Sequence, residues 1–244
     1  MSSAGRRSLR GLVAVVTGAS SGIGKAIARA LASEGARLVL VSRDERRLRD
    51  AAADWPGDAP PALLTADLLQ EADVAAVARS VVERFGAVDV LVHSAGTIAL
   101  GPFATLPLSS LDEQYRLNVR APFQLTQALL PHLVGARGQV VFVNSSAGLD
   151  ARAGVSQYGA TKHAAKALAD SLREEVHADG VRVVSVFPGR TATPMQAQVR
   201  DMEGRAYDPE ACLRAEDVAS VVLNALTMPE SAEVKDISIR PMKE

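Results

Sequence analysis

The sequence contains a single cysteine, Cys212, among its 244 residues. One cysteine excludes an intramolecular disulfide and a metal site built from several cysteines, and it makes a cytoplasmic enzyme the default expectation. There is no apolar run near the roughly 20 residues that a membrane-spanning helix needs. The opening segment MSSAGRRSLR has no apolar core of a secretory signal and is too short for a transit peptide. We therefore expect no membrane association and interpret residues 1–10 as a flexible tail.

The sequence also lacks an excess of charge of either sign. It has 27 Lys and Arg against 28 Asp and Glu, a net charge of -1 at pH 7. Nucleic-acid-binding domains usually carry a strong basic excess, so we expect no nucleic-acid partner. With 48% hydrophobic and 23% charged residues, the chain can bury a full core and remain soluble.

Short apolar runs alternate with helical patterns along the whole chain. Continuous apolar runs such as 12–16 are typical of strands buried on both faces, and segments such as 24–35 have apolar residues at helical spacing. This alternation predicts one doubly wound, Rossmann-type α/β domain over residues 11–244, with a parallel sheet flanked by helices on both faces. The expected strands are 12–16, 37–42, 62–67, 88–96, 138–146, 181–189 and a last one in 235–241, and the expected helices are 24–35, 44–55, 71–86, 109–134, 156–178 and 215–227, with 192–210 irregular.

The stretch TGASSGIG (17–24) lies between the first expected strand and the first expected helix. A helix amino terminus at this place attracts anions, most often phosphate, and glycines let a ligand approach the backbone closely. A nucleotide triphosphate loop is excluded because its Gly-Lys-Ser/Thr spacing is absent, whereas a plain structural loop stays open. The stretch therefore predicts a dinucleotide site with contacts from Gly18, Ser20, Ser21, Gly22, Ile23 and Gly24.

A second constellation combines Ser145, Tyr158 and Lys162. The tyrosine and lysine are four residues apart, so on a helix they project from the same face. A free tyrosine has a pKa of about 10; a nearby ammonium, together with an oxidised nicotinamide ring, would lower that pKa into a useful range. Taken one by one, these residues have ordinary explanations as core, surface and capping residues. Their joint position opposite a dinucleotide site favours acid–base chemistry.

The two patterns together resemble those of the short-chain dehydrogenase/reductase family, in its compact single-domain branch, over about residues 9–241. The glycine turn matches the family's T-G-x-x-x-G-x-G motif, and Tyr158 with Lys162 matches its Y-x-x-x-K pair. Ser145 stands thirteen residues before the tyrosine, as the family's catalytic serine does, with Ser146 as a competitor. The remaining matches are a helix asparagine and a Pro-Gly turn with the threonines that follow it: Asn118, Pro188, Gly189, Thr191 and Thr193.

One motif departs from the family pattern. The family usually has Asn-Asn-Ala-Gly after its fourth strand, and this chain has HSAG at 93–96. Ala95 and Gly96 keep the small residues, while Ser94 forms hydrogen bonds with less reach than asparagine. We expect an effect on loop rigidity rather than on catalysis, and we interpret His93 as a structural residue rather than a catalytic base.

The resemblance implies an oxidoreductase that interconverts a carbonyl and an alcohol by hydride transfer. Tyr158 is then the general acid/base, Ser145 binds the substrate oxygen, Lys162 tunes Tyr158 and Asn118 positions a water that relays protons. The alternative is a non-catalytic dinucleotide-binding sensor or scaffold, which the complete catalytic set disfavours. Beyond the glycine turn, the implied cofactor contacts are Asp67, Leu68, Ser94, Ala95, Gly96, Tyr158, Lys162, Pro188, Gly189, Thr191 and Thr193.

The end of the second strand bears on the choice of cofactor. An NAD enzyme of this fold usually has an acidic residue there, but this chain has Ser42 followed by Arg43. A guanidinium can hold the 2′-phosphate of NADP(H) in a bidentate manner, so we expect NADP(H) rather than NAD(H). Asp44 complicates this expectation because it could pair with Arg43 or approach the ribose itself.

The sequence gives less information about the substrate and the oligomeric state. We expect a small carbonyl or alcohol substrate in contact with residues 97–103, 149–157 and 192–210. The last stretch reads as a flexible, partly apolar lid that carries Met195, Val199, Met202 and Tyr207. The resemblance implies a symmetric homotetramer, or a homodimer.

Overall fold

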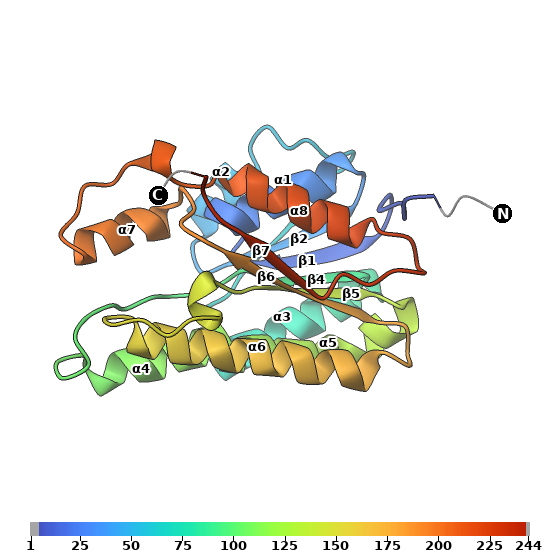
Figure 1. Ribbon diagram of the computed structural model, residues 1–244. Helices are drawn as coiled ribbons and strands as arrows, with labels where there is room; N and C mark the ends of the chain where they lie inside the picture. Colours follow the sequence, from blue (N-terminus) through green and yellow to red (C-terminus); the bar gives the residue numbers. More distant parts are fainter. Residues whose placement is uncertain (1–4, 243–244) are drawn as a thin grey trace.

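The computed structural model describes residues 5–242 and confirms the doubly wound α/β fold (Figure 1). Within these residues a seven-stranded parallel sheet has the order β3-β2-β1-β4-β5-β6-β7. The order changes direction between β1 and β4, and folds of this kind bind ligands at such a point, outside the carboxyl ends of the strands. The strands are β1 (Val13–Thr17), β2 (Arg37–Ser42), β3 (Ala62–Thr65), β4 (Val90–His93), β5 (Gln139–Val143), β6 (Arg182–Pro188) and β7 (Asp236–Ile239).

Helices cover both faces of the sheet, because each parallel connection must cross over. In Figure 1, α1 and α8 lie above the sheet and α3, α5 and α6 lie below it, while α7 stands at the edge of the molecule. No helix within residues 5–242 is both long enough and apolar enough to cross a bilayer. The α-helices are α1 (Gly22–Ser33), α2 (Glu45–Ala51), α3 (Glu71–Phe85), α4 (Leu108–Tyr115), α5 (Ala121–Ala136), α6 (Ser156–Val176), α7 (Pro194–Met202) and α8 (Ala215–Leu226).

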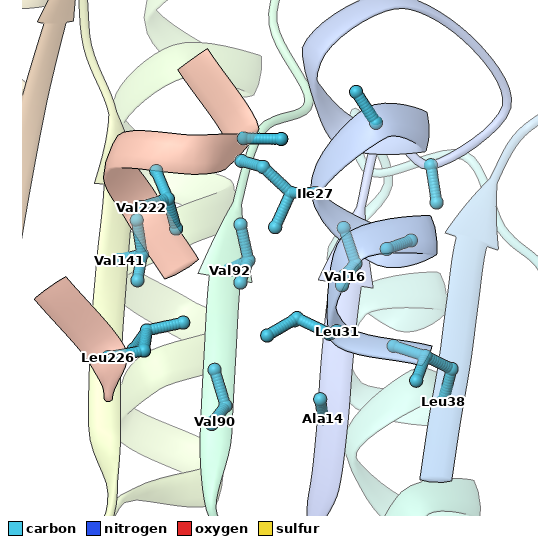
Figure 2. Close-up of a cluster of buried hydrophobic side chains, with 14 of the residues drawn as sticks. Ala14, Val16, Ile27, Leu31, Leu38, Val90, Val92, Val141, Val222 and Leu226 are labelled. Carbon is cyan, nitrogen blue, oxygen red and sulfur yellow. The ribbon is translucent and has the colours of Figure 1, made fainter. Parts of the chain in front are cut away.

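The core between the sheet and the α1–α8 pair is shown in Figure 2. Ile27 and Leu31 of α1 and Leu226 of α8 point at the strands, and each is at most 1% exposed. Val15 of β1 faces the opposite side, in a second apolar cluster with residues of α3 and α5. Because strand side chains alternate between faces, the continuous apolar runs of the sequence fill both clusters. Each large side chain buried in this way stabilises the fold by about 1.5–3 kcal/mol.

Several expected strands are longer than the observed ones at their carboxyl ends. The expectations 62–67, 88–96 and 138–146 end in the structure at Thr65, His93 and Val143. The residues beyond these ends leave the sheet as loops, and those loops line the ligand cleft described below.

The segment expected as one helix at 109–134 is helical throughout, but it is not a single regular α-helix. The structure has α4, then a π-helical turn at Arg116–Arg120, then α5. Pro122 at the start of α5 has no backbone N–H to donate one turn back, and its ring crowds the carbonyl there, which disfavours regular α-helical bonds at the π-helical turn.

The irregular structure expected at 192–210 was also wrong in part, because α7 lies within it. The Thr193 side chain caps this helix by accepting a hydrogen bond from the Gln196 N–H at 3.2 Å, and Pro194 occupies its first turn. Threonine at the N-cap followed by proline is a local helix-start signal that the sequence contains.

The amino-terminal segment is attached to the domain over its described part. Leu9 is 1% exposed within the core, and the Arg7 N–H donates to the Thr227 carbonyl at 2.9 Å. Residues 1–4 of the expected tail lie outside the described residues.

Candidate functional site

A cleft of about 620 Å³ opens at the carboxyl ends of the strands. It is lined by the β1–α1 turn, by the loops after β2 to β6, and by α7. With the exception of Asn118, every cofactor-binding and catalytic residue predicted from the sequence lines this cleft. The fold therefore brings the glycine turn and the Ser145, Tyr158 and Lys162 set to the same space.

The glycines of the first turn allow close approach between protein segments as well as to a ligand. Gly18 has φ +66°, and a Cβ there would lie 2.7 Å from the Ala95 nitrogen. A Cβ on Gly24 would lie 2.5 Å from the Gly18 oxygen, and one on Gly22 would lie 2.9 Å from the Thr193 methyl. Helix α1 begins at Gly22 rather than at the expected residue 24, so its unpaired first-turn N–H groups lie at the cleft.

Thr17 connects this turn to the loop after β4. Its hydroxyl donates to the Val92 carbonyl at 3.2 Å and accepts from the N–H groups of Ser94 and Ala95 at 3.1 and 3.2 Å. The side chain is 2% exposed, so these bonds are shielded from water. Sequence analysis missed this role because the bonds join segments about 75 residues apart.

Tyr158 and Lys162 share one face of α6, as their spacing predicts. The Lys162 ammonium donates to the Val143 carbonyl at 3.1 Å and lies 5.7 Å from the centre of the Tyr158 ring. Burial lowers the pKa of Lys162 to about 8 and raises the pKa of Tyr158 to about 12, with the Ser145 hydroxyl acting in the opposite direction on Tyr158. In the protein alone, loss of hydration outweighs the hydrogen bond with Ser145. The lowering of the Tyr158 pKa expected from Lys162 together with an oxidised nicotinamide ring stays a prediction.

Asn144 fixes the serine against this helix. Its side-chain amide donates to the Lys162 carbonyl at 3.0 Å, and its oxygen accepts from the Ser145 N–H at 2.9 Å. Gly148 makes room for it, because a Cβ there would lie 2.6 Å from the Asn144 oxygen. Asn144 was not among the predicted site residues. Its place at the end of a buried strand, directly before Ser145, is the feature of the sequence that could have indicated it.

Asn118 lies behind the cleft wall, in the π-helical turn, and is 3% exposed. Its side chain accepts from the Thr97 N–H at 2.9 Å and donates to the Thr97 carbonyl and the Thr161 hydroxyl, both at 3.0 Å. It therefore holds the loop after β4 against the helix that carries Tyr158. π-helical turns of this kind occur frequently at functional sites.

The end of β2 provides a polar corner of the cleft. The Ser42 hydroxyl donates to that of Ser20 at 2.9 Å. Asp44 caps α2 by accepting from the Arg47 N–H at 3.0 Å, and its carboxylate lies 3.6 Å from the Arg47 side chain. The Arg43 guanidinium has no hydrogen bond or ion pair with any residue that the structure describes. Arg47 also lines the cleft, although it was not among the predicted site residues. Its spacing of four residues from Arg43 is the pattern in the sequence that could have indicated it.

A model of the short chain dehydrogenase family matches residues 12–204 of this sequence. The chain belongs to the short-chain dehydrogenase family. An uncharacterized oxidoreductase of Staphylococcus epidermidis is 35% identical over 231 residues, which are 94% of this chain and 97% of the relative.

Solved short-chain dehydrogenases have the same architecture. A metagenomic short-chain oxidoreductase in complex with NADP has a TM-score of 0.83 and 33% identity, covering 98% of this chain and 100% of its own. An alcohol dehydrogenase from the archaeon Thermococcus sibiricus, complexed with 5-hydroxy-NADP, has a TM-score of 0.86 and 28% identity over 96% and 97%. Family and fold together make this short-chain dehydrogenase an NAD(P)-dependent oxidoreductase.

The HSAG departure from the usual short-chain dehydrogenase motif has a structural explanation. His93 is 4% exposed, its Nε2 lies 2.7 Å from the Thr126 hydroxyl, and its ring packs 4.9 Å from that of Phe142. Burial lowers its pKa to about 3, so it stays neutral. His93 thus belongs to the core, and the loop that follows is held by Thr17.

The part of the cleft where we expect the substrate has apolar walls and a charged rim. Met195 and Val199 of α7 line the cleft, whereas Met202 and Tyr207 do not. Glu203 accepts from Arg190 at 3.1 Å and from Arg200 at 2.9 Å, which closes the end of α7 onto the loop after β6. In the described part of the chain no group of three or more His, Cys, Asp or Glu side chains could hold a metal ion. Further apolar lining residues include Ile98, Leu100, Leu117 and Val155.

Proposed function

We propose that this short-chain dehydrogenase interconverts a small carbonyl compound and its alcohol with NADP(H) as the cofactor and Tyr158 as the general acid/base. The observation that carries the proposal is the meeting of Ser145, Tyr158 and Lys162 with the glycine turn in one cleft. The single Cys212 supports a cytoplasmic location.

The lining residues fit a dinucleotide. Gly18, Gly22 and Gly24 line the cleft without side chains that could block it, and the start of α1 favours a pyrophosphate. Arg43 and Ser20 would hold the 2′-phosphate, and Lys162 the nicotinamide ribose. When bound, this cofactor supplies or accepts a hydride. The remaining contacts would come from Asp67 and Leu68 at the adenine, Ser94, Ala95 and Gly96 at the adenosine ribose, and Pro188, Gly189, Thr191 and Thr193 at the carboxamide.

The protein's own residues handle the proton and the substrate oxygen. In the reductive direction the Tyr158 hydroxyl donates its proton to the carbonyl oxygen; with a pKa of about 12 it is protonated across the neutral range. The Ser145 hydroxyl donates a hydrogen bond to the same oxygen and stabilises the charge that develops there. Lys162, with a pKa of about 8, is mostly charged at pH 7 and stabilises the phenolate that remains. Asn118 keeps the two cleft walls at a fixed separation, and the water relay through it stays a prediction.

The rival function is a non-catalytic dinucleotide-binding sensor or scaffold. We expect the wild-type protein to turn over at least one member of a panel of aldehydes, ketones, alcohols and hydroxy acids, followed by the absorbance of reduced nicotinamide. Cofactor binding by calorimetry is measured in parallel. Tight cofactor binding without turnover of any panel member would contradict the enzyme and support the sensor.

We further propose that the protein forms a homotetramer, or a homodimer. Leu108 and Tyr115 of α4 and Phe123 of α5 are 71%, 48% and 52% exposed, and a two-fold contact between copies through these helices would bury them. Light scattering is expected to give four times, or twice, the chain mass of 25.6 kDa, and Phe123→Glu to lower it. A mass of one chain for the wild type at micromolar concentration would contradict this assembly.

A further inference from the structure

A second cavity, of about 280 Å³, lies at the end of the sheet opposite the cleft. Strand β6 joins the two, because it begins at Arg182 in the cavity wall and ends at Pro188 in the cleft. The cavity is assembled from the amino-terminal segment, the ends of α5 and α6, and the loop before β7. Its charged lining residues are Arg7, Arg137, His177, Arg182, Glu230 and Glu233.

The guanidinium groups in this cavity differ in how many of their N–H groups donate hydrogen bonds to the protein. Arg182 is 8% exposed and donates to the Met228 and Ala232 carbonyls at 3.1 and 3.0 Å, so it is a fixed part of the wall. The stem of Arg137 packs over Gly180, and its guanidinium has no hydrogen bond or ion pair within residues 5–242. The Arg7 guanidinium makes only long bonds, at 3.4 Å, to the Arg137 carbonyl.

These cations also repel one another. The pKa of Arg182 is lowered, first by burial and then by the charge of Arg7, while Glu230 and Glu233 oppose the shift. Arg7 and Arg137 therefore offer N–H donors and positive charge that the described protein leaves largely unused. Guanidinium groups in this arrangement suit a tetrahedral oxyanion, which they can bind in a bidentate manner.

Glu233 is an acceptor in the same cavity, so it favours a ligand that can also donate a hydrogen bond. Its Oε1 atom is buried and has no hydrogen-bond partner among the described residues, while its Oε2 atom lies 3.8 Å from the His177 ring. The Glu233 carboxylate lines the cavity and would repel an oxyanion that carries no proton, so a ligand that brings its own O–H group to it is favoured. Hydrogen phosphate has such a group at neutral pH, whereas sulfate has none and an ionised phosphomonoester has little, since its second pKa is about 6.

We propose that this cavity is an inorganic phosphate site, in which Arg7 and Arg137 bind phosphate oxygens and Glu233 accepts the phosphate O–H. The volume equals that of about nine waters at ~30 Å³ each, which leaves room for the ion and part of its hydration shell. The site is independent of the proposed oxidoreductase activity.

Calorimetric titration of the full chain with inorganic phosphate tests the site. We expect saturable binding to the wild type that weakens at least about tenfold in Arg7→Gln/Arg137→Gln, because charge-assisted hydrogen bonds are lost. Arg79→Gln on α3 is the matched control, since Arg79 is exposed and lines neither cavity, and it is expected to bind as the wild type does. Absence of saturable binding would overturn the proposal.

The cofactor cleft could also bind phosphate, so the titration is repeated in Arg43→Ala. Binding is expected to persist there; loss in Arg43→Ala with retention in the double variant would place phosphate in the cleft and overturn the site. Sulfate and a phosphomonoester are expected to bind at least about tenfold more weakly than phosphate, and Glu233→Gln to reduce this preference, because an amide can donate to sulfate. Equal binding of sulfate and phosphate to the wild type would also overturn it, and this arm does not depend on the folding of the double variant.

Discussion

Tyr158→Phe is expected to lower the turnover rate by roughly 10²–10⁴-fold and to leave cofactor affinity nearly unchanged. The ring is 8% exposed and packs beside Lys162, and phenylalanine keeps that packing while it removes the hydroxyl. Only the hydroxyl moves a proton in the proposed chemistry. The loss should therefore be seen in kcat and not in the Kd of the cofactor.

Steady-state kinetics with any accepted substrate, alongside cofactor titration, measures both quantities. Tyr115→Phe is the control, because Tyr115 is 48% exposed on α4 and does not line the cleft. If Tyr158→Phe keeps more than about a tenth of the wild-type rate, Tyr158 is not the acid, since a positioned acid contributes at least 10²-fold.

The wild-type pH profile gives a second readout of the same residue. Burial raises the pKa of Tyr158 to about 12, so the hydroxyl is present throughout the neutral range and reduction needs no ionisation of it. Oxidation of the alcohol needs the phenolate, whose fraction grows as pH rises toward that pKa. The oxidative rate is therefore expected to increase with pH, and Tyr158→Phe to abolish the increase.

Arg43→Ala is expected to lower kcat/KM for NADP(H) by tens to over a hundredfold, equivalent to about 2–3 kcal/mol, and to change NAD(H) little. Arg43 has no partner among the described residues, and Asp44, the complication in the sequence, is occupied as the cap of α2. The Ser20–Ser42 hydroxyl pair in the same corner offers further donors to a phosphate.

Specificity is measured as kcat/KM for both cofactors in wild type and variant. Arg46→Ala is the matched control, because Arg46 is exposed on α2, three residues after Arg43, and does not line the cleft. Wild-type preference for NAD(H), or an equal loss with both cofactors in Arg43→Ala, would remove the assignment to NADP(H).

The parts of the site that could be predicted from the sequence are those set by local spacing. The turn around Gly18 and the pair formed by Tyr158 and Lys162 each lie within one short segment, where backbone geometry alone determines which groups are neighbours. The same reasoning identified the strands, whose apolar runs are continuous.

The missed parts depend on tertiary contacts. Thr17 and Asn144 act by joining segments that are distant in sequence, and no local pattern marks their partners. The extent of burial, which raises the pKa of Tyr158 in the protein alone, is likewise a property of the assembled fold that spacing does not report. Helix α7 is a different case, because the sequence contains its start signal at Thr193 and Pro194, and the expectation of irregular structure over 192–210 did not use that signal.

The contact between Gly22 and Thr193 constrains how this protein can evolve. Thr193 packs against the glycine turn and caps α7, so a substitution there would alter both the turn that we propose holds the cofactor and the start of α7. Natural selection cannot adjust those two properties separately at this position. Changes of substrate preference are instead free to accumulate farther along α7, at Met195 and Val199, whose side chains line the cleft without taking part in the shared junction.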